Sequence, residues 1–192
     1  MSKAVMLSIR PQWCQKITSG EKTIEVRKTK PKLETPFKCY IYCTRDKHLA
    51  FMQNQTGTNL IACMDVDAAI PVGGAIGNGK VIGEFTCERI APITYDGGRL
   101  WCPTNAAFSP ATCLSQAEII AYIGDKGRCY GWHISDLLIY DQPRELSEFQ
   151  RATDPCDSCH AEYTWECTDC KKFGGNIKRP PQSWCYVDDA NA

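Results

Sequence analysis

Three charged side chains, Lys22, Glu25 and Arg27, stand close together in the segment GEKTIEVRK, residues 20–28. An arginine guanidinium offers a planar fork of donors that suits a phosphate or a base edge, and a lysine ammonium adds a point charge. A glutamate carboxylate accepts hydrogen bonds, for example from exocyclic amino groups. This set therefore suits a nucleobase, a nucleotide or a phosphodiester. The alternative is a solvated strand face whose charges pair with one another.

A second group of side chains with chemical potential is formed by cysteines. Cys156 and Cys159 make one CxxC pair, and Cys167 and Cys170 make another after seven intervening residues. Four thiolates match the tetrahedral coordination of a structural zinc, and His160 could replace one of them. A catalytic zinc would need an open coordination position, and a redox role would need only one of the two pairs. We therefore predict a structural zinc that folds residues 151–178.

Three further side chains have two interpretations each. Ser8 either binds a ligand or caps the helix that follows it. Trp13 either stacks on a base or packs in the core. His133 has the pKa range for acid–base chemistry, but a histidine on such a strand is more often a hydrogen-bonded structural residue. The nine cysteines outside the two CxxC pairs are expected to be buried small hydrophobes.

The balance of charge limits the kinds of ligand. The 192 residues carry 22 Lys and Arg and 22 Asp and Glu, so the formal net charge is zero. The whole molecule is therefore not a general attractor of nucleic acid or of anionic membranes. Residues 21–47 have a local net charge of +4, which fits either an anion-binding patch or an ordinary solvated face. In this region Lys28, Lys30 and Lys32 either extend a phosphate track from the triad or form a solvated loop.

The cellular compartment decides how the 13 cysteines are interpreted. The N-terminal residues contain no apolar run long enough for a signal peptide, and about 18 consecutive apolar residues occur nowhere. We therefore expect a cytoplasmic protein with no membrane association. In a reducing compartment the cysteines should be thiols or metal ligands.

The elements that must position these residues are mostly short strands. Alternation and β-branched or aromatic content predict strands over 4–9, 23–27, 37–44, 80–93, 129–140 and 183–187, with a bulge at Gly83. Helices are predicted from Pro11 to about Gly20 and after Ser115, where Glu118 completes a capping box. Residues 45–79 are expected to be a long excursion with a short helix, and residues 96–110 a loop.

These elements predict a β-rich α+β fold in which a small β-barrel is flanked by helices. A barrel leaves no strand edge exposed. The barrel domain is expected to comprise residues 1–150 and 179–192, and residues 151–178 are expected to be a zinc-knuckle insertion between two of its strands.

The sequence resembles the ASCH domain family, which has a PUA-like β-barrel fold. Gly20, Lys22, Glu25 and Arg27 match its GxKxxExR signature, and the strand and helix in SIRPQWCQKITSGEKTIEVRK precede the motif as they do in that family. KVIGEFTCERI is similar to its central barrel strand, CYGWHISDLLIY to a late strand, and PPQSWCYV to the closing strand of phage-type and bacterial members. The resemblance covers most of residues 4–145 and 182–188.

This resemblance implies a cleft beside the barrel that binds RNA or a modified nucleoside. Some ASCH proteins are amidohydrolases of N4-acetylcytidine that use a Lys, a Thr and a Glu, and others are described as ribonucleases. Only Lys22 matches the first set, since Glu25 stands at the position of the Thr.

The leading hypothesis is binding of RNA or a nucleoside-like small molecule by Lys22, Glu25 and Arg27, with contributions from Ser8, Trp13 and His133. A second hypothesis is a hydrolase in which Lys22 activates a nucleophile or stabilises an oxyanion and Glu25 moves the proton. A third is a zinc-dependent protein-interaction adaptor. The sequence leaves the ligand and the oligomeric state open.

Overall fold

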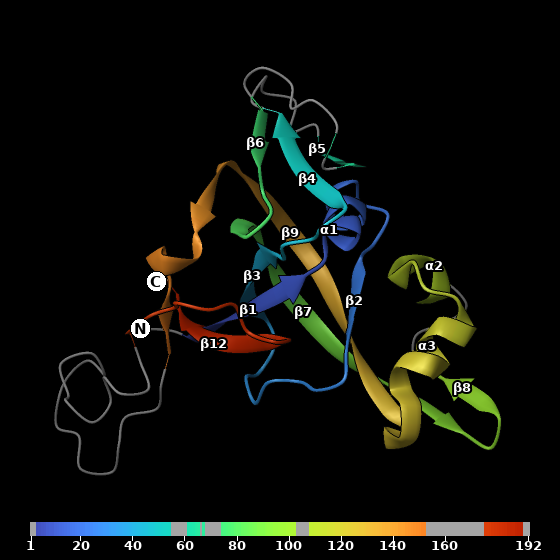
Figure 1. Ribbon diagram of the computed structural model, residues 1–192. Coiled ribbons are helices and arrows are strands. Elements are labelled where there is room, and N and C mark those ends of the chain that lie inside the picture. The colour runs from blue at the N-terminus through green and yellow to red at the C-terminus, as the bar shows by residue number, and fades with distance from the viewer. Residues whose placement is uncertain are drawn as a thin grey trace, which may run out of the picture.

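The computed structural model describes residues 3–54, 61–65, 67, 74–102, 108–152 and 175–189, and its main feature is a curled nine-stranded sheet (Figure 1). The strand order is β11-β10-β12-β1-β3-β7-β9-β2, and β8 pairs with β7. All pairs are antiparallel except β1 with β3. The strands are β1 (Lys3–Ile9), β2 (Ile24–Arg27), β3 (Phe37–Cys43), β7 (Lys80–Asp96), β8 (Arg99–Trp101), β9 (Arg128–Glu145), β10 (Gln150–Arg151), β11 (Gly175–Asn176) and β12 (Trp184–Asp188).

The predicted β-rich fold with few helices is confirmed, but the sheet does not close into a complete barrel. Among the described strands, β2 stands at one end of the order and β11 at the other. β2 is therefore an edge strand, paired through backbone hydrogen bonds with β9 alone.

Strands β7 and β9 are the longest elements and run side by side from Lys80 opposite Glu145 to Thr94 opposite Arg128. The register shifts between Val81 and Gly83, which confirms the predicted irregularity there. A side chain at Gly83 would collide with the carbonyl oxygen of Leu138, so the close approach of the two backbones requires glycine.

The excursion at residues 45–79 differs from the prediction. Its described residues form a separate three-stranded sheet, β5-β4-β6, with β4 (Leu49–Asn54), β5 (Ile61–Asp65) and β6 (Gly74–Ile76), in place of the expected short helix. Asn78 fastens β4, since its side chain accepts from the backbone N–H of Phe51 at 2.6 Å and donates to the carbonyl of Leu49 at 2.8 Å. Cross-strand pairing with partners distant in sequence sets this structure.

Three α-helices are described: α1 (Pro11–Thr18), α2 (Phe108–Thr112) and α3 (Gln116–Ile123). Pro11 opens α1 as predicted, and both hydrogen bonds of the predicted capping box hold the start of α3. Helix α2 and strand β8 lie in the region predicted as a loop. Short 3-10 turns cover Gly124–Lys126 and Leu146–Glu148. No helix in the described ranges is long and apolar enough to span a membrane.

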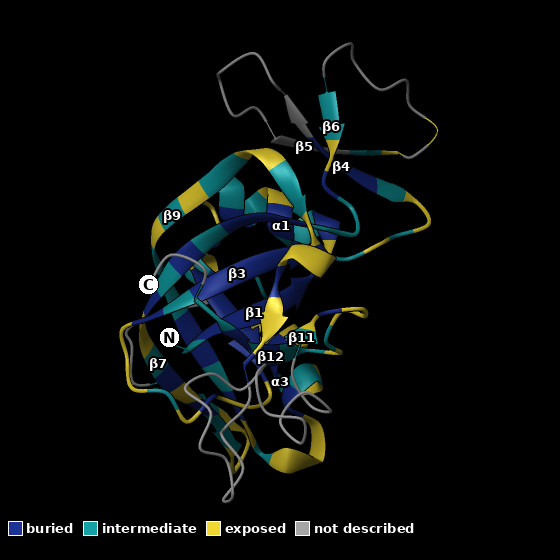
Figure 2. Ribbon diagram, turned by 90° about the vertical axis from the view of Figure 1, so that its left-hand side faces the viewer, coloured by how far each residue is buried: buried dark blue, intermediate teal, exposed yellow. Residues whose placement is uncertain are grey.

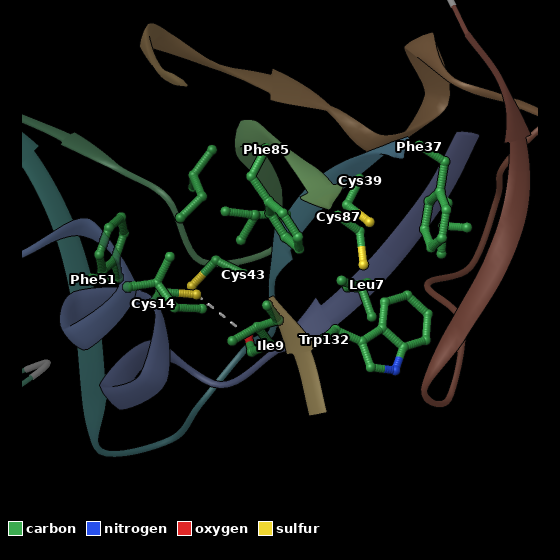
Figure 3. Close-up of a cluster of buried hydrophobic side chains, with 14 residues drawn as sticks. Leu7, Ile9, Cys14, Phe37, Cys39, Cys43, Phe51, Phe85, Cys87 and Trp132 are labelled. Carbon is green, nitrogen blue, oxygen red and sulfur yellow. Dashed lines mark hydrogen bonds between the residues drawn. The ribbon is translucent and has the colours of Figure 1, made fainter. Parts of the chain in front are cut away.

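The core lies inside the curled sheet, where the buried residues of the strands gather (Figure 2). Its centre is the fully buried Trp132, whose ring packs edge-on against Phe37 at a centroid distance of 5.8 Å. Cys14, Cys39, Cys43 and Cys87 lie among the apolar side chains of the same cluster (Figure 3). The described cysteines are free thiols and most are buried, as predicted.

Candidate functional site

A pocket of about 810 Å³ opens at the side of the sheet that the pairing leaves unclosed. Its walls come from the end of β1, from α1, from β2, from α3 and from the segment before β12. The lining residues are Ser8, Ile9, Arg10, Trp13, Lys22, Glu25, Val26, Arg27, Lys28, Thr29, Thr44, Leu114, Glu118, Tyr122, Gln182 and Ser183. Five of the six residues predicted to bind a ligand thus line one cavity.

The charged residues of the motif are buried in this wall. The residue exposures of Lys22, Glu25 and Arg27 are 3%, 6% and 8%. The interpretation as a solvated strand face is therefore wrong, although the charges do pair with one another. β2 is buried on both faces, because Ile24 and Val26 pack into an apolar cluster with α3 while the charged residues face the pocket.

Glu25 lies between the two cations of the triad. Its Oε1 is 3.0 Å from Nη2 of Arg27, and its Oε2 is 3.3 Å from Nζ of Lys22. Both carboxylate oxygens are thus engaged. The three groups together carry a net charge of +1, held in a nearly water-free wall where an unpaired charge is costly.

Lys22 is held within the protein by two hydrogen bonds and one ion pair. Its Nζ donates to the carbonyl of Thr112 at 2.7 Å and to that of Ile24 at 2.9 Å, and it pairs with Glu25. The ring of Trp13 lies beneath it, with the centroid 5.2 Å from Nζ. In this arrangement Lys22 ties the end of α2 to β2.

Arg27 bridges the open side of the sheet. Its Nη2 donates to the carbonyl of Ser8 in β1 at 2.8 Å, and its Nη1 lies 3.4 Å from both the carbonyl and the hydroxyl oxygen of Ser183. Its Nε is buried and has no hydrogen-bond partner among the described residues. A buried donor without an acceptor costs free energy, so this atom is an unsatisfied group in the pocket wall.

Ser8 does not cap the helix that follows it. Its hydroxyl donates to the carbonyl of Pro181 at 2.6 Å, and its backbone N–H donates to the carbonyl of Ser183. The N-cap of α1 is Arg10, whose side chain makes no capping hydrogen bond. Ser8 therefore joins the end of β1 to the segment before β12, beside the carbonyl that Arg27 reaches.

Two aromatic side chains, Trp13 and Tyr122, give the pocket its apolar surface. Burial raises the pKa of Tyr122, and the Arg27 cation opposes this shift. Tyr122 reaches the pocket from α3, which packs against β2 and β7 through Ile119 and Ile123. Tyr122 could not be predicted as a site residue from the sequence, because only the packing of α3 against the sheet brings it to the motif.

The charge of the lining is positive. Arg10, Lys22, Arg27 and Lys28 face two carboxylates, Glu25 and Glu118, so the net charge is +2. Hydrogen bonds from the backbone N–H and the hydroxyl of Ser115 lower the pKa of Glu118. An anionic group therefore enters a favourable field in this pocket.

The sixth predicted ligand-binding residue, His133, lies outside the pocket lining. It stands on β9 opposite Ile24, and its Nε2 is 3.2 Å from Nη2 of Arg89. Burial lowers the pKa of His133, and the neighbouring Arg89 cation lowers it further. The predicted zinc ligands, Cys156, Cys159, Cys167 and Cys170, and also His160, lie outside the described residues. Within the described part of the chain, no group of three or more His, Cys, Asp or Glu side chains is arranged to hold a metal ion.

Neither a protein-family model nor a curated protein matches this chain. Among solved structures, the crystal structure of ASCH from Zymomonas mobilis is similar over 97% of this chain and 88% of its own, with 17% identity and a TM-score of 0.50. A tyrosine-to-phenylalanine variant of that protein is similar over 98% of this chain and 92% of its own, with 18% identity and a TM-score of 0.53. These similarities establish the fold, and the resemblance to ASCH domains is confirmed at that level.

Proposed function

We propose that this chain, which has the fold of the ASCH structures, binds a nucleotide of RNA or a modified nucleoside in the pocket beside β2. The observation that carries the proposal is Arg27, a buried arginine at the pocket wall whose Nε has no partner among the described residues. The Arg27 guanidinium is suited to donate hydrogen bonds to a phosphate oxygen or a base carbonyl.

The shape and lining of the pocket support a ligand with an aromatic part and an anionic part. A volume of about 810 Å³ is within the usual range for small-molecule sites. Trp13 and Tyr122 offer rings on which a base can stack. The net charge of +2 favours a phosphate, and a single pocket suits a short segment better than a long duplex.

The contacts of Lys22 and Glu25 support binding over the hydrolase alternative. Catalysis by this pair would require a free lysine donor and a free carboxylate oxygen, but Lys22 is held by Thr112, Ile24 and Glu25. Both oxygens of Glu25 are also engaged. The adaptor alternative depends on residues 151–178, most of which lie outside the described residues.

The test is calorimetric titration of the protein with the four nucleoside 5′-monophosphates and their uncharged nucleosides. At least one monophosphate is expected to bind, and more tightly than its nucleoside. Arg27→Lys should weaken its binding about tenfold or more, because a lysine keeps the charge but lacks the planar fork. Arg89→Lys is the matched control, since Arg89 is exposed and lies outside the lining.

Tyr122→Leu provides a second variant that leaves the polar triad in place, and it should weaken binding through lost stacking, worth about 1–3 kcal/mol. Absence of binding for all eight compounds and for N4-acetylcytidine would refute the proposal, as would unchanged affinity in both variants. Multiple turnover of RNA or N4-acetylcytidine by the wild type, lost in Lys22→Met, would show that the protein is a hydrolase and not only a binding protein.

A further inference from the structure

We infer that Lys28, Lys30 and Lys32, here named the lysine strip, hold the backbone phosphates next to the nucleotide in the pocket, so that the ligand is a single-stranded nucleic acid and not a free nucleotide. This inference rests on the proposed function of the pocket. It concerns the segment between β2 and β3, which in Figure 1 passes beneath β12.

The three lysines of the strip are exposed, and within the described part of the chain none has a carboxylate at ion-pair distance. The residues between them are buried or anchored. Thr29 Oγ1 accepts from Nε1 of Trp184 at 2.9 Å, and Pro31 is buried. The backbone N–H of Lys32 donates to the hydroxyl of Tyr186 at 2.8 Å. The backbone is thus fixed to β12, while the three charges remain available to solvent.

Two tyrosine rings lie next to two of the lysine side chains in the strip. Nζ of Lys28 is 5.1 Å from the ring centroid of Tyr122, and Nζ of Lys30 is 5.9 Å from that of Tyr130. Both tyrosines are half-buried, so part of each ring is accessible. A cationic path interleaved with stacking surfaces is the usual composition of a single-strand binding surface, because every base has a π-face and every linkage has a charge.

The strip continues from the pocket. Lys28 and Thr29 belong to the pocket lining, whereas Lys30 and Lys32 lie beyond it. The Cα atoms of successive lysines, two residues apart, are separated by at most about 7 Å. Glu34 is the single acidic residue in 28–36, and the molecule as a whole has zero net charge, so the attraction is local.

An acidic protein segment is an alternative ligand for the three lysines. The neighbouring pocket favours nucleic acid, because it adds an arginine, two aromatic side chains and a positive field at the end of the strip. A peptide carboxylate would use the charges but not the rings.

The test compares a nucleoside 5′-monophosphate with a single-stranded RNA hexamer of the same base, for the base that binds best. The hexamer is expected to bind more tightly and with a steeper dependence on salt. Lys30→Ala/Lys32→Ala should lower the slope of log K against log salt by about 1.4, which is about 0.7 for each phosphate contact. At 0.1 M salt this corresponds to a loss of up to about 25-fold for the hexamer, with no change for the monophosphate. Lys47→Ala/Lys178→Ala removes the same charge from exposed positions outside the pocket and the strip, and it should leave both affinities unchanged.

The outcomes separate the inference from the proposed function. If neither monophosphate nor hexamer binds, the proposed function fails and the inference with it. If the monophosphate and the hexamer bind with equal affinity and equal salt dependence, the proposed function of the pocket stands, but the inference about the lysine strip is overturned. If hexaglutamate displaces the hexamer as effectively as unlabelled RNA does, the strip is a general anion surface and the inference is also overturned.

Discussion

At the scale of single residues, Glu25 is the anion that holds the two cations of the triad together. Its carboxylate contacts both Lys22 and Arg27, and all three side chains are almost fully buried. Glu25→Gln would leave two buried cations without their counter-charge, so we expect the free energy of unfolding to fall by about 3–5 kcal/mol in urea denaturation. Glu21→Gln removes the same charge from an exposed pair with Lys16 and should cost less than about 1 kcal/mol. Equal effects of the two variants would show that burial does not strengthen the triad.

His133 provides a residue-scale prediction on pH. Burial and Arg89 lower its pKa from the usual 6.5, so its ring signals should titrate below pH 6.5 in proton NMR, and Arg89→Gln should move the midpoint upward. Because the folded-state pKa lies below that of the unfolded chain, protonation favours unfolding. The stabilising contribution is complete above about pH 6.5 and is lost as the pH falls toward the folded-state value. A midpoint at or above 6.5 would contradict this assignment.

At the scale of elements, α3 positions Tyr122, and its start is fixed by the capping box. The Ser115 hydroxyl accepts from the backbone N–H of Glu118 at 3.2 Å, and the Glu118 carboxylate accepts from the backbone N–H of Ser115 at 2.8 Å. Ser115→Ala should therefore cost about 1 kcal/mol of stability and weaken nucleotide binding as α3 loosens. Gln116→Ala changes an exposed residue of the same helix and is the control. A binding loss in the control as large as in the variant would argue against the cap.

The same cap predicts how α3 responds to acid. The two hydrogen bonds from Ser115 lower the pKa of Glu118 in the folded state below the usual 4.5, so their contribution is present above pH 4.5 and is lost as the pH falls through the lowered value. Wild type and Glu118→Gln should therefore differ in stability at pH 6 and converge in strong acid. Thermal unfolding curves at several pH values measure this difference, and a constant gap across pH would contradict it.

The unpaired edge of β2 lies beside the pocket. A strand with a partner on one side only presents unpaired backbone groups, and proteins protect such edges by short length and by covering elements. β2 has four residues, and the backbone N–H groups of Lys22 and Thr23 just before it donate to Lys16 in α1 and to Ala111 in α2. The pocket lies beside this edge, with α1 and α3 contributing to its walls.

The elements that the sequence predicted well are those whose signal is local. Alternation identified β2, apolar, β-branched or aromatic content identified β1, β3 and β12, and the Ser115–Glu118 spacing identified α3. The three-stranded sheet of β4, β5 and β6 was missed because its pairing joins segments separated in sequence. Helix α2, with five residues, is too short for a periodic signal. At the site, the motif predicted Lys22, Glu25 and Arg27. Arg10 and Tyr122 were not predicted, because only tertiary packing brings them into the pocket lining.

At the scale of the whole molecule, the strands that flank the predicted zinc-binding insertion suggest how it joins the sheet. β10 and β11 pair with each other, Gln150 with Asn176 and Arg151 with Gly175, so the chain leaves and returns at adjacent positions. We expect purified protein to contain about one zinc ion per chain by elemental analysis. Cys156→Ser/Cys159→Ser should abolish it, and Cys102→Ser/Cys113→Ser should not.

Removal of this zinc should leave the sheet folded. Chelation is expected to expose residues 153–174 to protease while the urea midpoint of the core changes little, because the described core is assembled from the strands and α1. Purified protein without stoichiometric metal would refute the zinc prediction, and loss of the whole sheet on chelation would refute the independence of the insertion.

The bridging role of Arg27 couples ligand occupancy to the folding equilibrium. The guanidinium spans from β2 to Ser8 and Ser183, so it helps to hold the side of the sheet that has no backbone ladder. A ligand that contacts this guanidinium adds contacts across the same span and binds only the folded chain. By mass action it would raise the free energy of unfolding by about 2.7 kcal/mol at a concentration one hundred times its dissociation constant. The abundance of the cognate ligand would then set how long each copy of the protein persists against proteolysis.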